Sequence, residues 1–117
     1  MKMIKIAIVD DNLFLQKTIQ EKLSFFEDIS IKSKSLNGKE LLQKLEKNAN
    51  LDLVLMDIEM PEMNGVETTA EVKKRYPHIK IIMLTVFDND ENIFKSIKAG
   101  ADGYLLKEIN PQELYNA

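Results

Sequence analysis

The chain has 117 residues, of which 44% are hydrophobic and 30% charged, with a formal net charge of −3 at pH 7 and no cysteine. This composition is typical of one ordinary globular domain, and it excludes a disordered chain, a disulfide framework and a thiolate metal site. The net charge gives no electrostatic reason to expect nucleic-acid binding by the chain itself, and no apolar stretch approaches membrane-spanning length. We therefore expect a cytoplasmic domain that does not associate with a membrane.

Apolar runs and amphipathic stretches alternate along the whole chain. Runs without alternation are typical of parallel strands that are covered on both faces, whereas Ile29 and Ile31 alternate with polar residues, which favours an edge strand. In chain order, the predicted strands are Ile4–Val9, Ile29–Ser35, Leu53–Met56, Lys80–Leu84 and Gly103–Leu106.

Helical spacing of apolar residues follows each of the first three predicted strands. The second of these helices begins at Asn37 and has Glu40 three residues later, which is a capping-box arrangement. The third follows Gly65 and stops before Pro77. The first carries the apolar stripe Leu15, Ile19, Leu23 and Phe26.

The last two predicted helices differ in length. The fourth covers Asn89–Ala99, and its spacing predicts that Ile93 and Ile97 face inward. The fifth begins at Asn110-Pro111, a cap followed by a first-turn proline, and only a few residues follow it. We therefore expect a truncated fifth helix and a chain that is a fragment of a longer protein, with no domain boundary inside residues 1–117.

Repeated β/α units with short connections and right-handed crossovers predict an α/β fold, a doubly wound five-stranded parallel sheet. The flavodoxin-like strand order 2-1-3-4-5 suits the polar second strand, because that order leaves it at an edge. The same order makes the first and third strands neighbours. Residues that follow these two strands should therefore lie close together.

Acidic residues stand at both of these strand ends. Asp10 and Asp11 follow the first strand, and Asp57 follows the third. Carboxylates that share a small space require protons or a cation, and a hard cation such as Mg²⁺ prefers oxygen ligands. Asp57 is also a candidate nucleophile, because carboxylates form aspartyl-phosphates.

Two further polar residues follow strands in the same way. Thr85 follows the fourth predicted strand and Lys107 the fifth, so a hydroxyl and an ammonium group should join the acids at one edge of the sheet. Phosphoryl transfer needs such a set, namely a nucleophile, a metal ion, and donors for the charge that develops on the phosphoryl oxygens.

Taken together, Asp10-Asp11, Asp57, Met60-Pro61 with Gly65, Thr85 and Lys107 resemble the signature of two-component response-regulator receiver domains. The resemblance spans essentially the whole chain. The stretch from Ala99 to Glu108 further resembles the NarL/FixJ (LuxR-type) branch, whose members usually carry a C-terminal helix-turn-helix. On this resemblance, residues 1–117 are a receiver domain and the DNA-binding output domain is absent from the chain.

The resemblance implies a role for each site residue. Asp57 accepts phosphate from a sensor histidine kinase, and the protein is a switch, not an enzyme with a turnover of its own. Lys107 pairs with the phosphoryl oxygens, and Thr85 and Tyr104 rearrange as switch residues. Implied Mg²⁺ ligands are Asp11, Asp57 and the backbone carbonyl of Glu59, with Asp10 acting partly through water. The resemblance also implies a possible homodimer on phosphorylation and contact with DNA only through the output domain.

Other interpretations remain open at this stage. Asp10 and Asp11 could cap the first helix, Lys107 alone could be a surface lysine, and Tyr104 alone could be a core residue. A small Mg²⁺-dependent phosphohydrolase also uses a strand-end aspartate, although the known type has a second aspartate where this chain has Glu59. The third possibility is an interaction module that signals without phosphate.

Overall fold

The computed structural model describes residues 3–58, 63–85 and 90–106, in which strands and helices alternate as predicted. The third and fourth strands each extend one residue beyond their predicted ends, to Asp57 and Thr85. The elements are β1 (Ile4–Val9), α1 (Leu13–Leu23), β2 (Ile29–Ser35), α2 (Gly38–Lys47), β3 (Leu53–Asp57), α3 (Gly65–Arg75), β4 (Lys80–Thr85), α4 (Asp90–Ala99) and β5 (Gly103–Leu106). The predicted α/β class is confirmed.

All strand pairs in the sheet are parallel, and the order is β2-β1-β3-β4-β5. The strand with alternating polar residues, β2, lies at an edge, as its sequence predicts. In the pairing of β1 with β3, Val9 lies opposite Met56. The residues that follow this pair, Asp10 and Asp57, therefore emerge side by side at the carboxyl end of the sheet.

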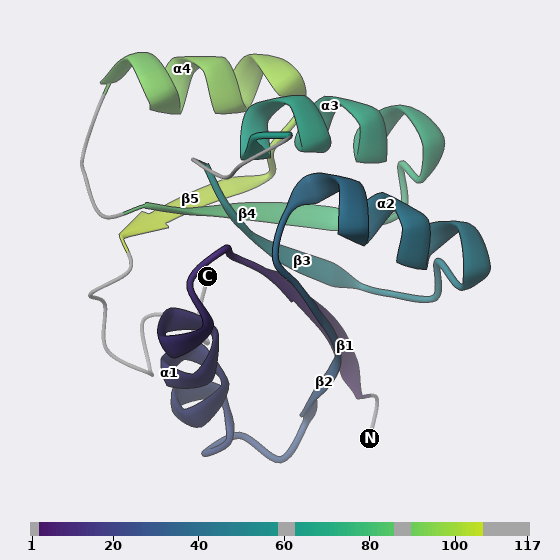
Figure 1. The fold of residues 1–117 in the computed structure, drawn as a ribbon, viewed down its shortest axis with the longest axis vertical. Coiled ribbons are helices and arrows are strands. Elements are labelled where there is room, and N and C mark those ends of the chain that lie inside the picture. Colours follow the sequence, from purple (N-terminus) through teal and green to yellow (C-terminus); the bar gives the residue numbers. More distant parts are fainter. Residues whose placement is uncertain (1–2, 59–62, 86–89, 107–117) are drawn as a thin grey trace.

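Helices cover both faces of the sheet, with α1 on one face and α2, α3 and α4 on the other (Figure 1). Because side chains alternate along a strand, β1 supplies both layers. Ile6 and Ile8 pack with residues of α1, whereas Ala7 and Val9 belong to the core under α2 and α3. Full burial of an aliphatic side chain of this size contributes about 1.5–3 kcal/mol, so these two layers hold the strand ends in place.

Asparagine side chains cap three of the helices. Asn12, Asn37 and Asn64 each accept a hydrogen bond from the backbone N–H three residues later, at 3.2, 2.9 and 2.9 Å. The predicted cap at Asn37 is confirmed. The interpretation of Asp10-Asp11 as the cap of the first helix is wrong, because α1 begins one residue after Asn12.

The orientation predicted for α4 is wrong at Ile97. This side chain is 63% exposed, and Phe94, one turn earlier, is 67% exposed, whereas Ser96 is buried. Adjacent helical residues point about 100° apart, so Ile97 does not share the direction of the buried Ser96. The side chain of Ile93 and the predicted fifth helix lie outside the described part of the chain.

The chain direction changes sharply after α4. Gly100 has a φ of 107°, which side-chain-bearing residues rarely adopt, and it directly follows Ala99, the last residue of α4. Within the described residues, no helix is both long and apolar enough to cross a membrane.

Candidate functional site

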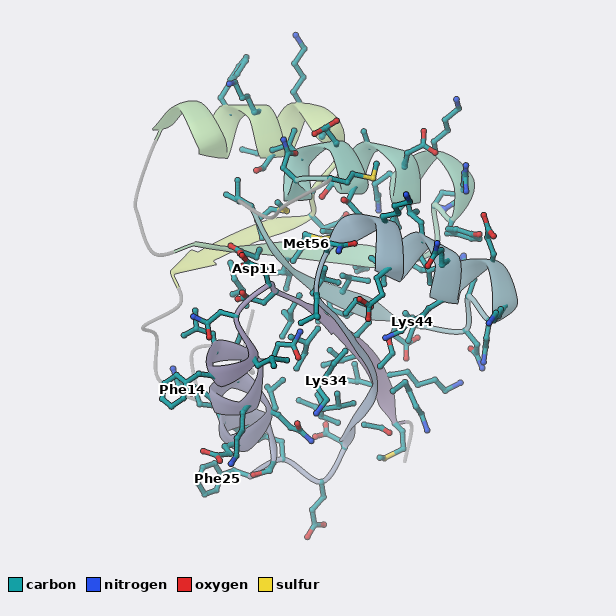
Figure 2. All side chains as sticks on the ribbon, viewed as in Figure 1. Asp11, Phe14, Phe25, Lys34, Lys44 and Met56 are labelled. Atoms are coloured by element: carbon teal, nitrogen blue, oxygen red, sulfur yellow. The ribbon has the colours of Figure 1, made fainter. Side chains whose placement is uncertain are left out.

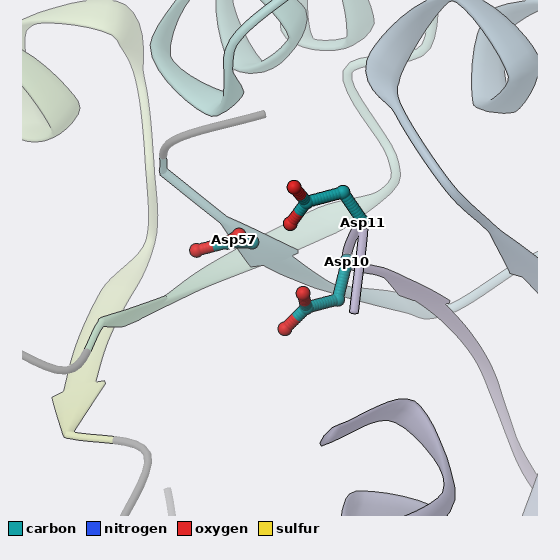
Figure 3. Close-up of side chains that lie close together, drawn as sticks. All are labelled: Asp10, Asp11 and Asp57. Atoms are coloured by element: carbon teal, nitrogen blue, oxygen red, sulfur yellow. The ribbon is translucent and has the colours of Figure 1, made fainter. Parts of the chain in front are cut away.

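Three carboxylates converge at the carboxyl end of the sheet, as the sequence predicts. Asp10, Asp11 and Asp57 each place an oxygen within 4.8 Å of the others. Figure 3 shows the three side chains directed toward a common space between the ends of β1 and β3. Asp10 is 1% exposed and Asp57 is 8% exposed, whereas Asp11 is exposed to solvent.

This arrangement suits a divalent metal ion. Negative charges this close repel one another strongly where water is largely excluded, so a cation or protons must compensate them. All three donors are hard oxygen atoms, and Mg²⁺ binds such oxygens while keeping several of its waters. The exposed Asp11 leaves one side of the group open to solvent, where those waters would lie. The acidic group therefore fits Mg²⁺.

Asp10 is fixed from several directions. Its backbone N–H donates to the Ser35 carbonyl at 3.0 Å, and its Oδ1 accepts the Asn12 N–H at 2.9 Å. Gln16, on the first turns of α1, donates from Nε2 to the Asp10 carbonyl at 2.8 Å and to the Ser35 carbonyl at 2.7 Å. These bonds join the ends of β1 and β2 to α1 directly beneath the acids.

Sequence reasoning did not identify Gln16. It follows Leu15, the first member of the apolar stripe, so its side chain points near the buried face of α1. A polar residue next to such a stripe is the only signal that was available. Gln16 is 4% exposed in the structure.

Gly65 approaches the backbone of Asp57 very closely. The Gly65 N–H donates to the Ile58 carbonyl at 2.7 Å, and a Cβ on Gly65 would lie 2.0 Å from the Asp57 carbonyl oxygen. No side chain fits at this point. The sequence singled out Gly65 only through the family resemblance, and the structure supplies a steric reason for it.

The structure describes the backbone but not the side chain of some of the remaining predicted site residues, and others lie outside it. Thr85 is the last residue of β4 and pairs with Leu106 at the end of β5, so its backbone lies at the same edge of the sheet as Asp57. The side chains of Thr85 and Tyr104 lie outside the described part of the structure, as do Glu59 and Lys107. Their roles stay predictions.

A polar cluster at the opposite end of the sheet ties α3 to β4 and β5. The Asp102 carboxylate accepts from Lys73 Nζ at 3.0 Å and from the Ile81 N–H at 2.9 Å. Burial raises the pKa of Asp102, but the Ile81 N–H and the Lys73 ammonium outweigh it, so the pKa of this carboxyl lies below its ordinary value. This cluster stabilises the fold and takes no part in the acidic site.

The sequence matches the family described as response regulator receiver domain over residues 6–117. A response regulator protein VraR from Staphylococcus epidermidis is 37% identical over 114 residues, which cover 97% of this chain and 54% of that protein. VraR from Staphylococcus aureus has the same identity and coverage. The chain thus spans about half the length of the curated relatives it matches.

Solved structures give the same result. A DNA-binding response regulator of the LuxR family from Staphylococcus aureus has a TM-score of 0.88 and 30% identity, covering 97% of this chain and 94% of the other. A CheY-like receiver domain protein from Methanospirillum hungatei JF-1 has a TM-score of 0.85 and 33% identity, with coverages of 98% and 90%. The signal receiver domain of NarL from Mycobacterium tuberculosis has a TM-score of 0.90 at 21% identity, which shows the fold alone.

Identity over nearly the whole chain and the shared fold lead to one conclusion. This chain belongs to the response regulator receiver domains of two-component systems and is related to LuxR-family transcription regulators such as VraR.

Proposed function

We propose that the protein is a phosphorylation-dependent switch in which Asp57 accepts a phosphoryl group in a Mg²⁺-dependent reaction. The observation that carries this proposal is the convergence of Asp57 with Asp10 and Asp11 within 4.8 Å at the carboxyl end of the sheet. Open α/β sheets bind their ligands at this edge, and a carboxylate is a known covalent acceptor of phosphate.

The reaction needs little covalent chemistry from the protein. An oxygen of the Asp57 carboxylate attacks phosphorus in line, and a new P–O bond forms. The bond from phosphorus to the donor breaks, and its electron pair stays on the imidazole nitrogen of a phosphohistidine or on the acetate oxygen of acetyl phosphate. The main contributions of the site are therefore positioning and compensation of charge.

Asp10 and Asp11 support the proposed metal requirement. When bound, Mg²⁺ would compensate the negative charge that accumulates between the carboxylates and the incoming phosphoryl oxygens. We propose Asp11, Asp57 and the backbone carbonyl of Glu59 as direct ligands, with Asp10 acting partly through water. The geometry on β1 and β3 is compatible with this set, since exposed Asp11 faces solvent and Asp10 is buried behind it.

Other predicted residues would interact with the charge that phosphorylation adds. Phosphorylation adds roughly −1.5 to −2 charge and strong acceptor oxygens. In this proposal Lys107 pairs with the phosphoryl oxygens, Thr85 donates a hydrogen bond to them, and Tyr104 changes its rotamer in response. The position of Thr85 at the end of β4, one strand from Asp57, supports its part in this proposal.

We propose further that residues 1–117 are the receiver domain of a longer cytoplasmic regulator with a C-terminal helix-turn-helix output domain. The support is that the curated VraR relatives are nearly twice as long as the matched region and that a LuxR-family relative is named as DNA-binding. The partners in this proposal are a sensor histidine kinase and a second copy of the phosphorylated protein. Contact with DNA would be made only through the output domain.

The start of α1 provides a surface for the phosphoryl donor. Leu13 and Phe14 are 67% and 75% exposed and are the first two residues of α1, after the Asp10–Asn12 turn. Figure 2 shows Phe14 on the side of α1 that faces away from the sheet. Exposed apolar side chains at the start of α1, close in sequence to Asp10 and Asp11, fit the docking of a kinase domain that presents its phosphohistidine to Asp57.

Intact-mass spectrometry tests the proposal. The wild type, Asp57→Asn and a control variant, Asp102→Asn, are incubated with acetyl phosphate, with and without Mg²⁺. We expect one phosphoryl group to be gained by the wild type and by Asp102→Asn, only with Mg²⁺, and none by Asp57→Asn.

Two other outcomes would support rival functions. Absence of any mass gain would favour a module that signals without phosphate. Sustained hydrolysis of small phosphomonoesters, many turnovers per protein, would favour a phosphohydrolase. A gain of one phosphoryl group by Asp57→Asn would show that another residue is the acceptor.

A further inference from the structure

The side-chain amide of Gln16 is buried, and it donates to two carbonyl oxygens that lie outside the helix. Its Nε2 lies 2.8 Å from the Asp10 carbonyl oxygen and 2.7 Å from the Ser35 carbonyl oxygen, and the residue is 4% exposed. Both partners are carbonyl oxygens, so only the NH₂ end of the amide can serve them, and both of its hydrogens are used.

We propose that Gln16 is a positioning residue for the acidic site, which sets the affinity of the site for Mg²⁺ by fixing the backbone of Asp10. The inference deepens the proposed function and rests on it for the identity of the metal. Gln16 does not touch the metal or the phosphoryl group. It acts through the Asp10–Asn12 turn.

The hydrogen bonds around Asp10 explain how a distant amide can have this effect. The Ser35 carbonyl accepts from the Asp10 N–H at 3.0 Å as well as from Gln16. The Asp10 carboxylate is held in turn by the Asn12 N–H. Gln16 therefore closes a network in which the position of the Asp10 carboxylate depends on its own main chain, on β2 and on α1.

Removing the donor would take one hydrogen bond away from each of two buried carbonyl groups, those of Asp10 and Ser35. The turn would relieve this by moving toward water, and the convergence of Asp10 and Asp11 with Asp57 would become less well fixed. Loss of a group that orients a metal ligand typically weakens metal binding by about 10- to 100-fold. Because Gln16 orients the ligand through the backbone, we expect the lower limit, about tenfold.

Gln16→Met tests the proposal, because methionine has nearly the same length and no donor. The Mg²⁺ dissociation constant is measured by NMR, in which isotope-labelled protein is titrated with Mg²⁺ and the backbone amide signals of the Asp10–Asn12 turn are followed. Ile19→Val is the matched control, since Ile19 is buried one turn further along α1 and its truncation loosens packing without removing a hydrogen bond. Stability of all three proteins is measured by urea unfolding.

We expect the Mg²⁺ dissociation constant to rise about tenfold in Gln16→Met and to stay unchanged in Ile19→Val. Phosphorylation by acetyl phosphate should need correspondingly more Mg²⁺ in Gln16→Met but reach the wild-type rate at saturation. An unchanged dissociation constant in folded Gln16→Met, or an equal rise in Ile19→Val, would overturn the proposal. The metal titration uses no phosphodonor, so it gives its answer even if the wild type is never phosphorylated.

A measurement on the wild type covers the case in which Gln16→Met does not fold. The two amide hydrogens of Gln16 should exchange slowly with solvent and their signals should shift when Mg²⁺ is added. Rapid exchange, as in a solvated glutamine, or signals that ignore Mg²⁺ would also overturn the proposal.

Discussion

Substitution of Gly65 by alanine is expected to damage the acidic site through a purely steric effect. Among the described glycines only Gly100 has a positive φ, so the backbone of Gly65 is accessible to alanine. The obstacle is the neighbouring chain. The new Cβ would lie 2.0 Å from the Asp57 carbonyl oxygen and 2.9 Å from the Ile58 Cα.

The size of the effect follows from these distances. Ordinary contact requires roughly 1.5 Å more separation, and the obstructing atoms are backbone atoms that no rotamer change can move. Overpacking of this kind costs about 1–3 kcal/mol, and loss of the Gly65 N–H bond to Ile58 adds about 1 kcal/mol. Replacing glycine in a helix returns about 0.5–1 kcal/mol. We expect a net loss of about 2 kcal/mol, which lowers the melting temperature by roughly 8 °C in a domain of this size.

Thermal unfolding followed by circular dichroism and phosphorylation followed by intact mass provide the assay. Gly103→Ala is the control, because its Cβ would have no heavy atom closer than 3.4 Å, which is ordinary contact with the Ile82 side chain. Since the displaced atom belongs to Asp57, phosphorylation of Gly65→Ala should slow by about tenfold even far below its melting temperature. Equal melting temperatures and equal phosphorylation rates for the two variants would refute the steric argument.

Two further predictions concern parts of the molecule outside the acids. Asp102→Asn should lower the unfolding free energy by about 1 kcal/mol at neutral pH, because a charged acceptor for Lys73 and the Ile81 N–H is lost. The pKa of Asp102 is lower in the folded state than in the unfolded one. Its contribution to the unfolding free energy is therefore present above the ordinary carboxyl pKa and disappears as the pH falls through the pKa of the folded state. Urea unfolding at a series of pH values should show that the unfolding free energies of wild type and Asp102→Asn become equal in acid. Phe14→Ala should leave phosphorylation by acetyl phosphate unchanged and slow transfer from the cognate histidine kinase. Equal slowing with both donors would place the effect of Phe14 at the acidic site and not at a docking surface.

The strands were predictable because parallel strands need continuous apolar runs and few other segments have them. The runs at β1, β3 and β4 end at or within one residue of the observed strand ends. The position of β2 at an edge was predictable because its lysines and serines could not be buried on both faces. Convergence of the acids then followed from strand order, since each acid adjoins a strand end.

The orientation of α4 could not be predicted in the same way. Its spacing places Ile93 and Ile97 on one face of the helix, and periodicity alone assigns such an apolar face to the core. In the structure Ile97 is exposed, as is Phe94, and Ser96 faces inward. Periodicity identifies which residues share a face of a helix, but contacts with other elements decide which face is buried.

Gln16 was missed, and Gly65 was identified only through the family resemblance, for a related reason. The two acceptors of Gln16 lie 6 and 19 residues away in the sequence, and the close approach of Gly65 is to the end of the preceding strand. Both effects depend on atomic separations that only packing determines. These separations cannot be deduced from residue type and spacing.

The three acids of the site are not equivalent, and their environments support the choice of Asp57 as the acceptor. Asp10 is 1% exposed and one of its oxygens already accepts the Asn12 N–H, so a phosphoryl donor has little access to it. Asp11 is exposed at the start of a turn, where a side chain can exchange ligands but is poorly fixed for in-line attack. Asp57 is the last residue of β3, a central strand, and is 8% exposed, so its position is both rigid and accessible. A nucleophile requires both properties, and among these three acids only Asp57 has them.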